Sequence, residues 1–167
     1  MTWRSGTTEI SDKLLGSLPY LLPLFDAGVV GGALFKLIAN FPVLAPMGQA
    51  LLLLVTPVMF AYSLVPFGLG SLAVFFALFL LVVRNENISR FIRFNTLQAI
   101  LIGFIISIGR LVLSLLTVPG LDLITDTFYN VLLFGGVAVV GYSIVQCLMG
   151  RYSEIPTISE AVHMQIR

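Results

Sequence analysis

The side chains best suited to chemistry lie along one otherwise apolar stretch, residues 94–116. Asn95 and Gln98 stand about one helical turn apart near its start, and Ser107 and Arg110 have the same spacing further along. Amides, hydroxyls and a guanidinium can donate hydrogen bonds to a bound polar group, such as the backbone of a polypeptide. We therefore take these four residues as a candidate helix-interface or polypeptide-contact site.

Arg110 is the one charged residue that we expect inside a membrane span. A charge there is costly unless it is paired or reaches the headgroups. Its partners could be Asp122 or Asp126 in the next loop, which would make a polar site inside a helix bundle. The alternative, which we favour, is that Arg110 extends to the far headgroups and anchors the helix.

The same stretch carries a polar and small-residue stripe, which contains Thr96, Gly103, Ser107, Arg110 and Ser114. At 100° per residue these positions all fall within roughly 40° of the direction of Thr96 on a helix. Polar side chains in a span usually bond across helix contacts. The stripe therefore predicts helix packing, with contact to a bound or translocating polypeptide as the alternative.

Motifs of the common enzyme classes are missing from the sequence. The chain has one cysteine, Cys147, and one histidine, His163, which leaves little for a metal site. We therefore expect no catalytic residues, no cofactor and no metal.

The composition is that of an integral membrane protein of one domain. Of the 167 residues 58% are hydrophobic and 10% charged, whereas soluble domains carry about 25% charged residues. The net charge of +1 also makes nucleic acid an improbable partner, since such proteins need a basic face. The lipid bilayer is the expected surrounding.

The pattern of apolar runs predicts an all-α fold with four transmembrane helices in a domain over residues 44–148. Runs of about 20 apolar residues suffice to cross a hydrocarbon core. The expected spans cover residues 46–64, 67–83, 94–116 and 128–148.

The segments outside this domain are less apolar. We expect a flexible start over 1–11 and a polar tail over 149–167. Between 12 and 39, Pro19, Pro23 and Asp26 interrupt the apolar residues, which predicts two short amphipathic helices, about 12–22 and 27–39, lying in the membrane interface. Asp26 would cap the second one. A re-entrant hairpin is the alternative.

Basic residues fall on one side of this four-span arrangement. The group comprises Arg4, Lys13, Lys36, the interfacial loop residues Arg84, Arg90 and Arg93, and Arg151 and Arg167. Because Lys and Arg concentrate on the cytoplasmic side of membrane proteins, both termini and the loop should face the cytoplasm, or the stroma of a plastid.

Three stretches resemble the Tic-twenty family, the four-span subunit of the protein translocon in the chloroplast inner envelope. They are residues 18–26 (LPYLLPLFD), residues 82–101 around SRFIRFNTLQAIL, and the tail 155–165 (IPTISEAVHMQ). The resemblance covers about residues 14–165. It implies protein import, partner translocon subunits and stromal termini, and it transfers no catalytic residue. The polar start, unlike a transit peptide, suggests a cyanobacterial or plastid-encoded chain, in a cyanobacterial plasma or thylakoid membrane or the plastid inner envelope.

Three functions follow from these observations, in decreasing order of preference. The first is a translocon subunit that handles polypeptides. The second is a structural or assembly subunit of another membrane complex, such as a photosynthetic one. The third is a small-solute transporter, although we see no internal repeat of the kind such proteins often carry. Four helices with few polar residues cannot line a wide aqueous pore alone, so we expect self-association or other membrane subunits.

Overall fold

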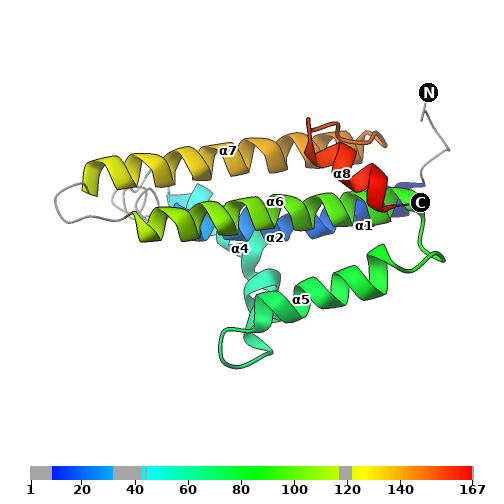
Figure 1. The fold of residues 1–167 in the computed structure, drawn as a ribbon, viewed down its shortest axis with the longest axis horizontal. Coiled ribbons are helices and arrows are strands. Elements are labelled where there is room, and N and C mark those ends of the chain that lie inside the picture. Colours follow the sequence, from blue (N-terminus) through cyan, green and yellow to red (C-terminus); the bar gives the residue numbers. More distant parts are fainter. Residues whose placement is uncertain (1–8, 32–42, 44, 117–121, 167) are drawn as a thin grey trace.

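The computed structural model describes residues 9–31, 43, 45–116 and 122–166, and within these ranges every regular element is a helix. Figure 1 shows their arrangement. In chain order they are α1 (Ile10–Ser17), η1 (Leu18–Tyr20), α2 (Leu21–Val30), α4 (Ala45–Ser63), α5 (Gly70–Leu78), the π-helical η3 (Phe79–Val83), α6 (Arg90–Leu115), α7 (Asp122–Leu148) and α8 (Ile158–Gln165).

Three long helical runs form the main bundle and lie side by side in Figure 1. They are Ile10–Val30, α6 and α7, the helices in the described ranges that are long and apolar enough to cross a membrane. Gly16 lies against Phe91 and Cys147, while Ala27 and Ile106 both lie against Gly136. Ile10–Val30 is therefore parallel to α6 and antiparallel to α7.

The structure corrects the predicted interfacial segment. Ile10–Val30 is one helical run of 21 residues, packed along helices that could cross a membrane, so it cannot lie flat in the interface while they cross. The short 3-10 turn η1 explains why the prolines do not break it: Pro19 occupies the start of η1 and Pro23 the first turn of α2, where the missing N–H costs little. Residues 32–39 of the predicted segment lie outside the described residues.

Two shorter apolar helices lie where the first two spans were predicted. They cover Gly48–Ser63 within α4, and Gly70–Val83 across α5 and η3. The expected all-helical membrane fold is thus confirmed, whereas four full-length spans are not. The helices at the predicted third and fourth spans, α6 and α7, begin earlier than expected, at Arg90 and Asp122. Ser89 caps α6 by accepting a hydrogen bond from the Ile92 backbone N–H (3.4 Å).

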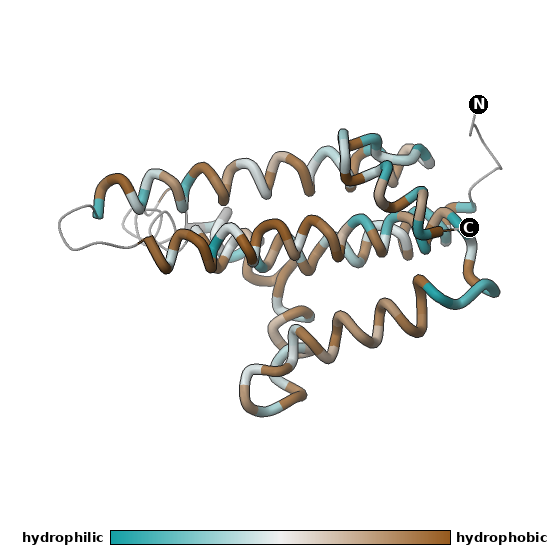
Figure 2. The backbone as a smooth tube through the Cα atoms, viewed as in Figure 1, coloured by the Kyte–Doolittle hydropathy of each residue, from teal (hydrophilic) through white to brown (hydrophobic). Residues whose placement is uncertain are grey.

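Polar residues gather at one end of the bundle. Figure 2 shows hydrophilic segments where α6 begins and α7 ends, and apolar residues along the middle of the long helices. Lys13 lies at this end, since its carbonyl oxygen accepts a hydrogen bond from the Cys147 thiol (3.5 Å). The same end holds the basic loop between η3 and α6. Arg4, Lys36 and Arg167 lie outside the described residues.

Two adjacent glycines of α7 offer a test of this packing. A Cβ at Gly136 would lie 3.1 Å from both the Ala27 Cβ and the Ile106 Cδ1, whereas a Cβ at Gly135 would meet nothing within 4 Å. We expect Gly136→Ala to destabilise the bundle by about 1 kcal/mol through overpacking. Gly135→Ala should be neutral or slightly stabilising, because alanine favours helix. Thermal unfolding in detergent compares the two, and equal effects would contradict this packing.

Candidate functional site

The first predicted site residue, Asn95, belongs to a buried hydrogen-bond network at the polar end of the bundle. The Tyr20 hydroxyl donates to Asn95 Oδ1 (3.0 Å) and lies 3.4 Å from the Ser153 hydroxyl. Asn95 Nδ2 in turn donates to the Phe91 carbonyl one turn earlier (2.8 Å). Tyr20, Asn95 and Ser153 are all fully buried. The network therefore joins the N-terminal helix, α6 and the tail.

Gln98 forms a hydrogen bond to the same tail. Its Nε2 donates to the Ser153 carbonyl (3.1 Å), which also accepts from the Ser159 hydroxyl (3.0 Å). Ser159 accepts from the Ile155 N–H (2.7 Å) and thereby closes the turn before α8. Gln98 is fully buried, and its Oε1 has no hydrogen-bond partner. Asn95 and Gln98 thus join the helices and the tail through buried hydrogen bonds.

The tail covers the start of α6. Val162 and Ile166 join Val83, Phe94 and Leu97 in one apolar cluster. The His163 ring lies 4.8 Å from the ring of Phe94. Burial among these rings raises the pKa of Tyr152, with the nearby Arg90 charge opposing the effect. The helix α8 begins after Thr157, whose side chain makes no capping hydrogen bond.

Arginines of the basic loop donate hydrogen bonds to backbone carbonyl groups at this end. Arg93 Nε donates to the Val83 carbonyl at the end of η3 (2.8 Å), and Arg90 Nη2 donates to the Ile166 carbonyl (3.4 Å). Arg84 is exposed. Two of the three predicted loop arginines therefore hold neighbouring segments in place.

Ser107 and Arg110 do not join this network. Both are exposed, beyond the middle of α6. A residue that the sequence interpretation missed lies near them: Asp26, taken there as a helix cap, lies inside α2 with its Oδ2 3.5 Å from the Cβ position of Gly103. The Asp26 carboxylate interacts electrostatically with Arg110 and with Tyr62 of α4. The expectation that Arg110 alone is charged within a span is therefore wrong.

The spacing of Pro19 and Pro23 could have predicted that Asp26 lies inside a helix and not at its start. Because each can stand in the first turn of a helix, residues 18–30 can form helix throughout, which places Asp26 among buried neighbours.

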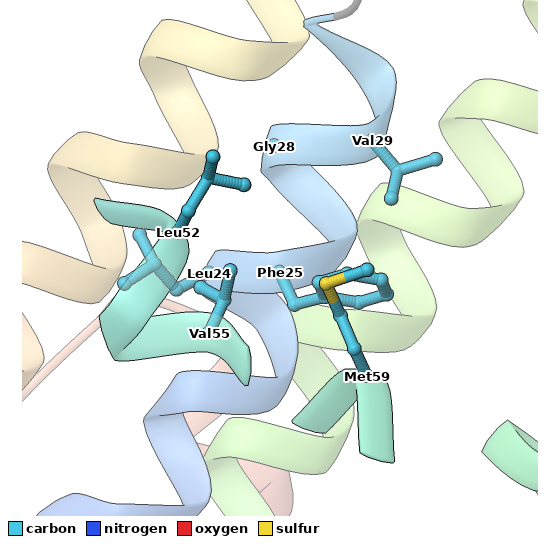
Figure 3. A pocket seen from close by; sticks show the side chains of 7 residues that line it. All are labelled: Leu24, Phe25, Gly28, Val29, Leu52, Val55 and Met59. Carbon is cyan, nitrogen blue, oxygen red and sulfur yellow. The ribbon is translucent and has the colours of Figure 1, made fainter. Parts of the chain in front are cut away.

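An apolar cavity of about 190 Å³ lies between α2 and α4. Figure 3 shows Phe25 and Val29 of α2 on one side and Val55 and Met59 of α4 on the other. The Phe25 ring also packs edge-on against the Tyr62 ring, with centroids 5.5 Å apart. The cavity thus lies beside Tyr62, and its lining residue Phe25 directly precedes Asp26 in α2. Among the residues that the structure describes, no three His, Cys, Asp or Glu side chains gather to hold a metal ion.

Comparisons with known proteins agree with these elements. The family model described as "Chloroplast import apparatus Tic20-like" matches residues 9–162, from the start of Ile10–Val30 into α8. A "Tic20 family protein" of Synechocystis is 42% identical over 98% of each chain. "Tic20 family protein Ycf60" of Porphyra purpurea is 32% identical over 95% of this chain and 77% of its own length. "Protein TIC 20-v, chloroplastic" of Arabidopsis thaliana is 28% identical over 96% and 73%. With such a match over nearly its whole length, the chain belongs to the Tic20 family.

Proposed function

We propose that this protein is a membrane subunit that acts in protein translocation within a multi-subunit complex. The family match over residues 9–162 carries the proposal. The apolar helices fit a protein surrounded by lipid, and we infer that it has no catalytic step of its own.

We further propose that the polar end of the bundle faces the cytoplasm or the stroma. The start of α1, the basic loop and the end of α7 lie at this end, and basic residues concentrate on that side of a membrane. In this orientation Ile10–Val30 crosses outward, and α4 with α5 returns. Then α6 crosses outward again and α7 returns, which leaves the buried tail on the inner side. The membrane would be a cyanobacterial plasma or thylakoid membrane, or the plastid inner envelope.

Depletion of this chain tests the proposed function directly. We expect membranes depleted of it to import or translocate a radiolabelled precursor at a several-fold lower rate, and to recover when the purified protein is restored. Purification of the native complex should yield subunits that bind precursors. If translocation is unchanged and the protein purifies with one fixed photosynthetic complex, its role is structural or in assembly.

A further inference from the structure

The turn that joins α4 to α5 carries an apolar side chain at its tip. Phe67 is 94% exposed and has a positive φ angle of 63°, which bulky side chains rarely adopt. The base of the turn is closed, because a Cβ at Gly70 would overlap the Tyr62 carbonyl group. Figure 1 shows the turn to one side of the bundle, level with the middle of the long helices. Phe67 therefore makes almost no contact with its own chain.

This turn suits neither lipid nor water. Lipid offers no hydrogen bond to non-helical backbone, so irregular segments occur inside a membrane only where protein covers them or water reaches them. Water is a poor neighbour for the side chains, because Leu64 and Leu69 are 65% and 50% exposed beside Phe67. A second protein surface meets both requirements, since it can bury the apolar side chains and also offer polar groups to the backbone.

The apolar cavity between α2 and α4 (Figure 3) has the chemistry and the size to take a phenyl ring. Apart from Gly28, every residue that lines it has an apolar side chain. A cavity of about 150 Å³ with an apolar lining is large enough to bind benzene, and this one has a volume of about 190 Å³. Val29, Leu52 and Met59 of the lining are 41%, 58% and 48% exposed. The cavity is therefore open to the surroundings of the protein.

The cavity and Phe67 lie at a similar depth in the bundle. Phe25 lines the cavity and packs against the ring of Tyr62, which stands at the base of the turn. Phe67 is three residues from Gly70 and hence within about 11 Å of that base. Two copies inserted in the same direction are related by an axis along the membrane normal, which keeps each residue at its own depth. The side chain of one copy can therefore meet the cavity of another.

We propose that Phe67 of one copy inserts into the α2–α4 cavity of a second copy of this chain, and that the protein self-associates in the membrane through this contact. The contact is self-complementary, because each copy carries both the projecting ring and the cavity that receives it. A lipid acyl chain in the cavity would leave the turn uncovered. One contact between copies covers the turn and fills the cavity at the same time.

Photocrosslinking in native membranes tests which molecule receives Phe67. Azidophenylalanine in place of Phe67 keeps the ring, and the same analogue in place of Phe134 is the matched control, because Phe134 is 59% exposed on α7. We expect the analogue at position 67 to trap a second, differently tagged copy several-fold more than the control does. The trapped peptide should contain lining residues of α2 or α4. Trapping of lipid or of a different subunit alone would overturn the proposal.

The substitution Phe67→Ala tests whether the contact drives association. Phe67 touches almost nothing in its own chain, so the variant should fold normally and its dissociation constant between copies should rise at least about tenfold, as for a buried aromatic anchor. Phe134→Ala should leave that constant unchanged. Energy transfer between differently labelled copies in liposomes measures both values. Absence of transfer in the unsubstituted protein, or equal association of the two variants, would overturn the proposal.

Discussion

Gly70→Ala is expected to open the α4–α5 turn and destabilise the protein by about 3 kcal/mol. A Cβ at Gly70 would overlap the carbonyl oxygen and Cα of Tyr62. Both are backbone atoms, so no change of rotamer can relieve the overlap and the two helices must separate. At this chain length the loss corresponds to a fall in Tm of roughly 6–12 °C.

The neighbouring substitution Ser71→Ala is the control for this prediction. Ser71 is exposed in the same first turn of α5, and its loss should change stability by less than about 0.5 kcal/mol. Thermal unfolding in detergent gives both values. A Gly70→Ala protein as stable as the control would show that α4 and α5 do not meet at Tyr62.

The apolar helices were predictable from the sequence because length and hydropathy are local properties. The helices α6 and α7 and the break between the predicted spans 46–64 and 67–83 follow from such patterns. The continuous helical run Ile10–Val30 was not predictable in this way. A proline inside a regular helix breaks it, whereas Pro19 and Pro23 are tolerated here because the helix restarts through a 3-10 turn. The error placed Asp26 at a helix start and hid its approach to Gly103.

Sequence patterns also could not predict which of the four polar site residues are buried. Asn95, Gln98, Ser107 and Arg110 share one helix, and at 100° per residue the first two lie on a different face from the last two. Ser153 of the tail contacts Gln98 directly and Asn95 through the Tyr20 hydroxyl, which are contacts between residues far apart in the chain. Ser107 and Arg110, further along, are exposed. Which polar residues pack and which stay available thus depends on tertiary contacts that spacing alone does not encode.

Asn95→Leu is expected to destabilise the polar end of the bundle by about 2 kcal/mol. Leucine fills a similar volume but can neither accept from the Tyr20 hydroxyl nor donate to the Phe91 carbonyl. Tyr20 would keep only the longer 3.4 Å contact with Ser153. Leaving buried polar groups poorly paired costs about 1–3 kcal/mol. Loss of the network should also expose the tail to protease earlier in a thermal ramp.

A double-mutant cycle with Tyr20→Phe separates the hydrogen bond from packing. Tyr20→Phe removes the hydroxyl and keeps the ring, so it should cost about 1 kcal/mol. The double variant should cost less than the two single costs added together, because neither side chain then leaves the other unpaired. We expect a coupling of about 0.6–1.7 kcal/mol, the range for hydrogen bonds between membrane helices. If the stability costs of the two single variants simply add, Asn95 contributes through its shape alone. The hydrogen-bond network would then not hold Ile10–Val30 against α6.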